Sequence, residues 1–408
     1  MGGERQKKKM LIAINTMGRG GAERALLSML AFISPEEYAV DLVAVIPRGV
    51  LFAQVPENVN IINGDWSAEP VLGAEGRKYL RSAALKRLFS KGYVFKNLPY
   101  FFRYFFAHVL KKKVRMEKLL WKPLADTTPK TEKEYDLAVA YLEGAATYYV
   151  ADHVSAQKKA AFLHIDYQLA GYIKEFDKPY YDKIDKIFCV SNDLKESFSK
   201  IFPEYGHKTD VMHNIIPRED IISKAESGGG FDDGFDGIRL LTASRLHVQK
   251  GIDFAVEAFA LLKSGGRYDN VRWYVLGEGD ERADIERRIR NHGLHESFIL
   301  CGAKDNPYPY FKQCDVYVQT SRWEGRAIVL SEALVLEKPV VTTRVMSVEE
   351  QILDGETGII VDLSAESIAD ALQKIIDDDE LRARFVQNIR ALPREDGSQL
   401  EKLLSMCE

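Results

Sequence analysis

Residues 239–263 read RLLTASRLHVQKGIDFAVEAFALLK, and this stretch decides the class of fold. The apolar run at 239–243 predicts a short buried strand, and the spacing of apolar residues over 251–263 predicts a helix. A polar loop that ends in Gly251 lies between them. A strand that passes at once into a helix is the building unit of a parallel sheet covered by helices on both faces.

The same alternation continues on both sides of this stretch. The predicted strands are 9–15, 38–46, 135–141, 160–164, 184–191, 271–276, 298–301, 316–319 and 339–342, and the predicted helices are 23–32, 193–201, 280–292, 328–336 and 365–376. The sequence therefore predicts an α/β protein with two doubly wound, Rossmann-like domains that face each other across a cleft. Ligands are expected at the carboxyl ends of the strands.

Length and one turn-rich stretch set the expected domain boundaries. A chain of 408 residues is long enough for two or three domains. The polar, glycine-rich residues 227–237 interrupt the alternation, so we expect domains at 1–217 and 238–385, joined by a linker at 218–237. The charged residues 386–408 predict a C-terminal helix that packs back toward the first domain.

Composition places the chain among ordinary globular proteins. Hydrophobic residues make up 46% and charged residues 28%, which excludes wholesale disorder and fibrous architectures. The four cysteines form no CxxC pair, which suits a reducing compartment. The apolar stretch 10–14 is too short for a signal peptide, and no run of about 18 apolar residues predicts a spanning helix. We expect a cytoplasmic protein.

Residues 77–122 differ from the rest of the chain in charge. They contain fourteen Lys and Arg residues, one acid and eleven aromatic residues, although the whole chain has a formal charge of -4. Cations interleaved with aromatic rings suit an anionic membrane surface, to which the chain would bind peripherally from its cytoplasmic side. A structural insert with solvated lysines stays open as the alternative. No nucleic-acid-binding motif accompanies the block, so nucleic acid is not an expected partner.

Two cations follow the strand at 239–243. Arg245 and Lys250 stand five residues apart in the loop SRLHVQKG (244–251), so both side chains can point at one diphosphate. Arginine offers a planar pair of donors and lysine a point charge. Solvated loop charges are the alternative interpretation.

A second group of polar residues follows the strand at 316–319. In EGRAIVLSE (324–332), Glu324 lies in the loop and Glu332 lies about one turn inside the helix that begins near Ile328. Carboxylates can accept hydrogen bonds from sugar hydroxyls, and free amides at a helix N-terminus can donate to phosphate. A helical surface acid is the alternative for Glu332.

The turn GRGGAER (18–24) follows the first predicted strand. Gly20 and Gly21 let the backbone approach a ligand, and the helix N-terminus offers free amides to an anion. The turn lacks the full G-x-G-x-x-G spacing, so a structural tight turn is an equal alternative. The acidic run 377–379 lies between predicted helices and is interpreted as capping and solvation.

The motifs SRL-x3-KG (244–251), LGEGDER (276–282) and E-x7-E (324–332) together resemble the C-terminal half of retaining glycosyltransferases of the GT-B fold. The group is the large fourth sequence family, glycosyl transferases group 1, which includes many bacterial polysaccharide and lipopolysaccharide enzymes. GGAER (20–24) is similar to the first turn of the same family, and the resemblance covers about 9–385. It implies transfer of a sugar from a nucleotide-sugar with retention of configuration and without a metal or other cofactor.

The resemblance also implies a role for each matching position. Arg245 and Lys250 would hold the donor diphosphate, Glu324 the sugar hydroxyls and Glu332 the ribose. The remaining positions would be Gly20, Gly21, Gly325, Arg326, Ala327 and Ile328 in the phosphate and sugar pocket, Ala303 facing the base through its backbone, and His164 touching the donor sugar. Residues 1–217 would form the acceptor side, and 238–385 would bind the nucleotide-sugar.

The chain departs from the family pattern after Gly325. The family commonly has an aromatic residue and then glycine or proline there, whereas this chain has Arg326 and Ala327. The expected donor is a UDP-linked sugar, and the expected acceptor is a glycan or a lipid-linked oligosaccharide. A nucleotide-sugar epimerase on the same fold and a non-catalytic partner subunit of a membrane glycan-assembly complex stay open. A NAD-dependent dehydrogenase is not expected, because the chain lacks the dinucleotide-binding fingerprint.

Overall fold

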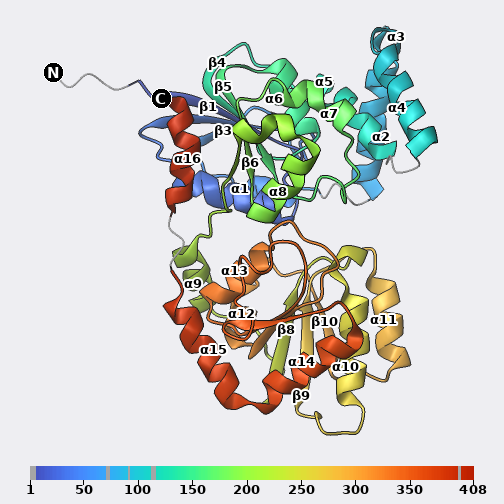
Figure 1. The fold of residues 1–408 in the computed structure, drawn as a ribbon, viewed down its shortest axis with the longest axis vertical. Coiled ribbons are helices and arrows are strands. Elements are labelled where there is room, and N and C mark those ends of the chain that lie inside the picture. The colour runs from blue at the N-terminus through green and yellow to red at the C-terminus, as the bar shows by residue number, and fades with distance from the viewer. Residues whose placement is uncertain (1–5, 70–73, 91, 112–115, 394–396) are drawn as a thin grey trace, which may run out of the picture. The chain divides into compact units, whose positions relative to one another are not determined.

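The computed structural model describes residues 6–69, 74–90, 92–111, 116–393 and 397–408. The chain divides into two compact units. Unit 1 comprises Met1–Ile215 and Glu395–Glu408, and unit 2 comprises Ile216–Arg394. Each unit is built on its own parallel sheet (Figure 1).

Unit 1 contains a parallel sheet with strand order β3-β2-β1-β4-β5-β6-β7. Its strands are β1 (Lys8–Ile14), β2 (Tyr38–Ala44), β3 (Val59–Ile61), β4 (Glu134–Ala140), β5 (Ser155–Leu163), β6 (Lys186–Cys189) and β7 (Thr209–Val211). Its α-helices are α1 (Gly21–Phe32), α2 (Ala74–Leu88), α3 (Tyr93–Lys96), α4 (Leu98–Lys111), α5 (Trp121–Thr127), α6 (Ala145–His153), α7 (Lys174–Tyr181), α8 (Asn192–Ile201) and α16 (Glu401–Leu404). Short 3-10 turns lie at Val50–Gln54, Met116–Leu120, Pro203–Lys208, Gly397–Leu400 and Ser405–Cys407.

Unit 2 contains a parallel sheet with strand order β10-β9-β8-β11-β12-β13. Its strands are β8 (Ile238–Ala243), β9 (Val271–Leu276), β10 (Phe298–Gly302), β11 (Val316–Gln319), β12 (Val340–Thr343) and β13 (Gly358–Val361). Its helices are α9 (Arg218–Glu226), the 3-10 turn Val248–Lys250, α10 (Ile252–Lys263), α11 (Arg282–Asn291), α12 (Tyr308–Gln313), α13 (Ile328–Val335), α14 (Ala365–Asp377) and α15 (Asp379–Ala391). The predicted α/β class with two doubly wound sheets is confirmed.

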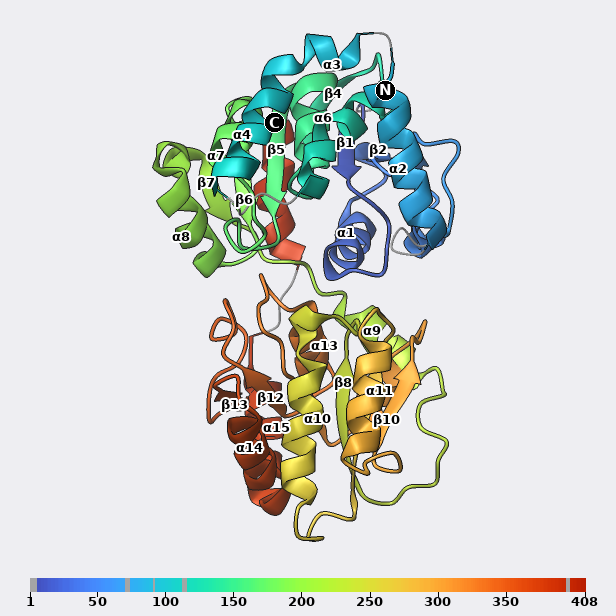
Figure 2. The same cartoon turned by 90° about the vertical axis from the view of Figure 1, so that its right-hand side faces the viewer.

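Both faces of the unit 2 sheet are covered, which explains its continuous apolar strands. Helices α10, α11 and α14 pack on one face around Trp273, Phe259 and Phe298 (Figure 2). Helices α12 and α13 pack on the other face around Phe311 and Tyr317. This burial fixes the register of the strands, and so it fixes where their carboxyl ends place the loops.

The predicted domain boundaries need two corrections. Residues 218–226 are not linker but helix α9, whose Ile221 and Ala225 pack against Tyr308 of unit 2. The apolar residues on one face of this helix are stabilised by burial against unit 2, which an exposed linker would not provide. At the other end, α15 extends to Ala391 within unit 2, and only the residues after it return to unit 1, where Lys402 Nζ donates to the Val211 carbonyl at 2.8 Å.

The acidic run between α14 and α15 acts as predicted. The Asp378 carboxylate accepts the Leu381 amide at 2.8 Å and caps α15. Asp377 accepts the Tyr268 hydroxyl at 3.0 Å. These contacts assign the run to helix capping and packing.

Helices α2, α3 and α4 form an insert between β3 and β4 at the outer side of unit 1, beyond α5 and α7 (Figure 1). This is the basic, aromatic block predicted at 77–122, of which residues 91 and 112–115 lie outside the described part. In the described part of the chain, no helix is long and apolar enough to cross a membrane.

Candidate functional site

The loop that follows β8 presents two cations at the carboxyl end of the unit 2 sheet. Arg245 is exposed, and its guanidinium forms no ion pair with any residue in the described part of the chain. Lys250 ends a 3-10 turn, and Gly251 then caps the amino end of α10 in a left-handed conformation with φ 62°. The positive end of the α10 dipole therefore lies beside Lys250.

Two glycines of the motif LGEGDER hold this loop in place. A Cβ at Gly277 would lie 1.7 Å from the Ser244 carbonyl oxygen, and one at Gly279 would lie 2.1 Å from the Leu246 carbonyl oxygen. The backbones are hydrogen bonded at the same place, because the Leu246 amide donates to the Glu278 carbonyl at 3.0 Å. Only glycine permits this approach, so the motif fixes the backbone that carries Arg245.

The loop that follows β11 locks onto the loop after β8. The Arg322 guanidinium donates to both carboxylate oxygens of Asp253 on α10, at 2.8 and 2.6 Å, and to the Val248 carbonyl at 2.6 Å. The Thr320 hydroxyl donates to the Gly251 carbonyl at 2.9 Å. Because β8 and β11 are neighbours in the sheet, these bonds join two predicted motifs into one rigid edge.

Lys250 and Glu324, predicted from separate motifs, meet in this edge. Lys250 Nζ lies 2.6 Å from Glu324 Oε1, and the Ser321 hydroxyl donates to the same oxygen at 2.6 Å. Glu324 is 8% exposed. A buried carboxylate that is paired and hydrogen bonded in this way keeps a fixed position. Both of these contacts involve Oε1. The other carboxylate oxygen, Oε2, takes part in neither of them.

The amino end of α13 differs from the expectation of free amides. The Ala327 amide donates to Gln351 Oε1 at 3.2 Å, and Gln351 Nε2 donates back to the Ala327 carbonyl at 2.9 Å. The helix begins at Ile328 as predicted, directly after Gly325 and Arg326. The Arg326 side chain is buried, and its Nη1 lies 4.0 Å from Glu350 Oε2. The Ala327 amide is therefore already used inside the unit.

Glu332 and Ala303 complete the predicted positions of unit 2. Glu332 is buried within α13 rather than on the surface, and Tyr308 of α12 donates its hydroxyl to Glu332 Oε1 at 2.9 Å. Ala303 is exposed and directly follows β10, which ends at Gly302. The surface-acid interpretation of Glu332 is therefore wrong.

In unit 1, the Glu23 side chain lies against the glycine turn that precedes α1. Helix α1 begins at Gly21, and Gly20 is its N-cap residue. A Cβ at Gly20 would lie 2.2 Å from Glu23 Oε2, and the Thr16 hydroxyl donates to Glu23 Oε1 at 2.9 Å. The Glu23 carboxylate thus occupies the electropositive helix end at which an anion was expected.

His164 stands at the carboxyl end of β5 beside a buried acid that the sequence did not single out. Burial lowers the pKa of His164 to about 4, so its ring is neutral near pH 7. Its backbone amide donates to Glu143 Oε2 at 3.2 Å. Glu143 is 5% exposed, and burial raises its pKa to about 7. The two residues are 21 positions apart and meet because β4 and β5 are neighbours.

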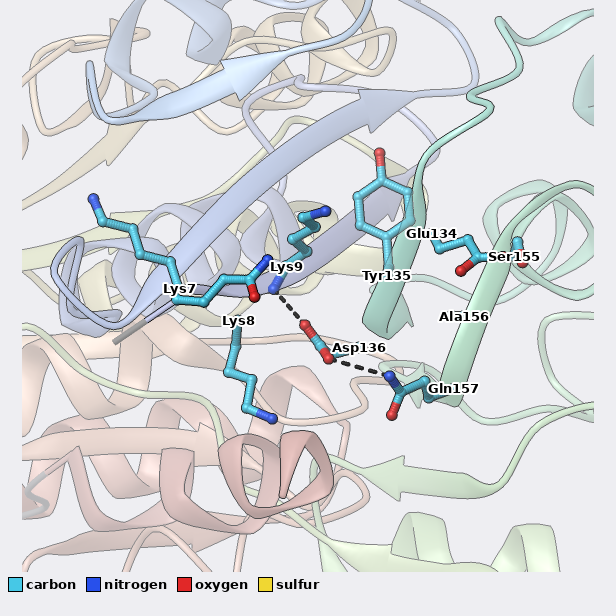
Figure 3. Close-up of a pocket in the computed structure, with 10 residues that line it drawn as sticks. Lys7, Lys8, Lys9, Glu134, Tyr135, Asp136, Ser155, Ala156 and Gln157 are labelled. Atoms are coloured by element: carbon cyan, nitrogen blue, oxygen red, sulfur yellow. Dashed lines mark hydrogen bonds between the residues drawn. The ribbon is translucent and has the colours of Figure 1, made fainter. Parts of the chain in front are cut away.

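A pocket of about 520 Å³ lies at the opposite edge of the unit 1 sheet (Figure 3). It is formed by the amino ends of β1, β4 and β5, where the Lys9 amide and the Gln157 side chain both donate to Asp136. Ligands of parallel sheets bind at the carboxyl ends of the strands. The geometry therefore assigns no part of the candidate site to this pocket.

A sequence model of the family "Glycosyl transferases group 1" matches residues 236–392. Unit 2 is a group 1 glycosyltransferase domain. "Alpha-D-kanosaminyltransferase" of Streptomyces kanamyceticus is 31% identical over 157 residues, which are 38% of this chain and 40% of that protein. "N-acetylgalactosamine-N,N'-diacetylbacillosaminyl-diphospho-undecaprenol 4-alpha-N-acetylgalactosaminyltransferase" of Campylobacter jejuni is 29% identical over 207 residues, which are 50% of this chain and 54% of that protein. The chain thus spans about half the length of these curated relatives.

A solved structure extends the likeness of fold to both units. Anabaena Alr3699/HepE in complex with UDP and glucose aligns with 98% of this chain and 98% of its own, with a TM-score of 0.66 and 17% sequence identity. The fold of the chain is therefore that of the GT-B glycosyltransferases, as predicted.

Within the group 1 domain, the structure joins Arg245, Lys250 and Glu324 along neighbouring strand ends. It also places a residue there that the sequence did not single out. Gln319, the last residue of β11, is 3% exposed, and neither its Nε2 nor its Oε1 has a hydrogen-bond partner among the described residues. A polar residue that ends an otherwise apolar strand was the available signal.

Proposed function

We propose that this chain is a glycosyltransferase that moves a sugar from a UDP-linked donor to a glycan or lipid-linked acceptor in cell-surface polysaccharide synthesis. One observation carries the proposal. Arg245, Lys250 and Glu324 lie on two interlocked loops at the carboxyl ends of neighbouring strands. This edge combines cations for a diphosphate with a fixed carboxylate for sugar hydroxyls.

The chemistry of the leaving group explains why the cations are needed. A departing nucleoside diphosphate gains negative charge, and the sugar becomes oxocarbenium-like and positive. Arg245, Lys250 and the amino end of α10 would stabilise that charge without a bound metal. The Glu324 carboxylate, held by Lys250 and Ser321, would orient the donor sugar. Glu332 would accept hydrogen bonds from the ribose.

Retention and the class of acceptor are parts of the same proposal. We infer that the acceptor hydroxyl attacks from the face that the diphosphate leaves, and that the departing phosphate takes its proton. The names of both curated relatives record an alpha linkage, and the Campylobacter name records a diphospho-undecaprenol acceptor. His164, which is neutral near pH 7, would contact the donor sugar from unit 1.

A donor screen tests the proposal. The full chain is incubated with UDP-, GDP- and ADP-sugars, with and without EDTA, and thermal midpoints and nucleotide release are recorded. We expect stabilisation by UDP and release of UDP from its sugar donors, unchanged by EDTA, and loss of both in Arg245→Ala. Stabilisation by no nucleoside diphosphate would contradict the proposal and favour a non-catalytic partner subunit. Isomerised donor without release would instead identify an epimerase.

A further inference from the structure

Tyrosines of the insert attach it to the rest of unit 1. The Tyr93 hydroxyl donates to Asp126 Oδ2 at 2.5 Å. Tyr104 is 3% exposed and packs on Phe176 of α7, with ring centroids 5.0 Å apart. Tyr100 packs on the same ring, with centroids 5.9 Å apart. These contacts hold α3 and α4 in a defined orientation on unit 1.

The insert also exposes several phenylalanines to solvent. Phe89 is 84% exposed and Phe95 82%, and Phe102, Phe105 and Phe106 on α4 are all more than half exposed. The usual order is inverted here, because the rings that carry a hydroxyl are inside and the purely apolar rings face outward. Isolated exposed apolar residues are common, but five exposed phenylalanines within one short insert mark an interaction site.

The charge around these rings selects the partner. Lys78 and Lys86 are exposed on α2 and Lys96 on α3, and residues 77–122 contain fourteen basic residues and one acid. A second copy of the chain would bring an equally basic surface against this one, and the like charges would repel. An anionic lipid surface meets both requirements, since it attracts the lysines and accepts aromatic rings below its headgroups.

We propose that the insert docks on an anionic lipid bilayer, with Phe89, Phe95, Phe102 and Phe105 at the boundary between headgroups and acyl chains. The lysines around them contact the headgroups. This surface would bring unit 1 to the plane in which a lipid-linked acceptor lies, and for that consequence the inference rests on the proposed function. The docking itself requires no donor or acceptor, so its test can fail separately from the test of activity.

Vesicle flotation of the full chain tests the inference. One set of vesicles is phosphatidylcholine alone, and the other contains about one third phosphatidylglycerol. We expect flotation with the anionic vesicles, at least about tenfold weaker flotation with the neutral ones, and loss of binding in high salt. Negligible flotation with both sets, or equal flotation with both, would overturn the proposal.

Surface variants separate the contributions of rings and charge. Phe95→Ser combined with Phe105→Ser is expected to weaken binding to anionic vesicles by about tenfold or more. Lys86→Glu combined with Lys96→Glu is expected to weaken it and to reduce its salt dependence. Leu261→Ser, at a 45% exposed position of α10 in unit 2, is the matched control and should bind as the parent does. Thermal midpoints verify that each variant is folded.

Two outcomes with these variants would contradict the docking surface. Equal binding of the parent and the double phenylalanine variant would show that the rings do not enter the bilayer. A concentration-dependent dimer that the same variant abolishes, without vesicle binding by the parent, would assign the face to a second copy of the chain.

Discussion

The carboxyl edges of the two sheets share a topology and differ in chemistry. In unit 2, the loops after β8 and β11 are tied together by Arg322 and Thr320, and charged groups such as Lys250 and Glu324 are paired in fixed positions. In unit 1, the corresponding edge holds His164, which is neutral near pH 7, and Glu143, which burial keeps protonated up to about pH 7. The unit 2 edge therefore holds charged groups in fixed positions, whereas burial disfavours the charged forms of both groups at the unit 1 edge.

This difference fits a division of labour between the two edges in the proposed sugar transfer. A diphosphate needs cations that do not move when charge develops, and interlocked loops provide them without reorganisation. A neutral histidine and a protonated acid can exchange hydrogen bonds with hydroxyl groups at little desolvation cost. Substitutions confined to one edge test the role of that edge separately.

The largest expected effect is loss of turnover when a cation of the unit 2 edge is removed. Arg245→Ala and Lys250→Ala should each lower turnover about 100-fold or more, since one preorganised charge contact contributes about 2.7–4 kcal/mol to transition-state stabilisation. Initial rates of nucleotide release measure this. Arg287→Ala, a 58% exposed position of α11, serves as the control. Near-parent rates in both site variants would remove the leaving-group role.

The acid of the unit 1 edge should make stability depend on pH. Folding raises the pKa of Glu143 from 4.5 to about 7 through burial, so the unfolded chain loses this proton first and stability falls as pH rises from about 4.5 to 7. Glu143→Gln stays neutral. Its free energy of unfolding relative to the parent should therefore rise by roughly 3 kcal/mol over that window, at about 1.36 kcal/mol per unit.

Urea unfolding at pH 4 and pH 8 measures this difference. Asp177, whose pKa burial raises to about 6, and Lys118 both act on Glu143, but they are present in parent and variant alike. Glu134→Gln, at the exposed amino end of β4, the strand that precedes Glu143, is the control and should follow the parent at both pH values. If the free energy of unfolding of Glu143→Gln changes with pH as that of the parent does, folding does not raise the pKa of Glu143.

The backbones of Gly279 and Leu246 lie so close together in the unit 2 edge that one added methyl group should lower the stability of the fold. Gly279→Ala places Cβ 2.1 Å from the Leu246 carbonyl oxygen, so the loop that carries Arg245 must shift. We expect the free energy of unfolding to fall by about 2 kcal/mol, with a parallel loss of UDP binding. Gly64→Ala in unit 1, where a Cβ meets nothing within 4 Å, is the control. Equal effects of the two substitutions would show that the approach is not tight.

Much of unit 2 could be predicted because its signals are local. The bounds of β9 and β11 match the prediction residue for residue, since each is an apolar run between polar loops. The pairing of Lys250 with Glu324 was not predicted, although both residues were, because no local pattern records which side chains of separate loops meet.

Unit 1 contains elements that local sequence patterns could not predict. Strands β3 and β7 have three residues each and were missed, since so short a run has no detectable period. Strand β5 begins at Ser155 rather than at 160, because its first half is polar and partly exposed yet pairs with β4. Glu143 carries no motif, and its environment arises only when neighbouring strands bring His164 beside it.

The smallest change in stability is expected at Gln319, the buried last residue of β11. Gln319 buries an amide with no hydrogen-bond partner among the described residues, whereas Gln351, which is also buried, bonds both the amide and the carbonyl of Ala327. Gln319→Leu should therefore raise the free energy of unfolding by about 1 kcal/mol, and Gln351→Leu should lower it by about as much or more. Chemical unfolding of both variants measures this pair. If Gln319→Leu is instead destabilising, the Gln319 amide has a hydrogen-bond partner in solution.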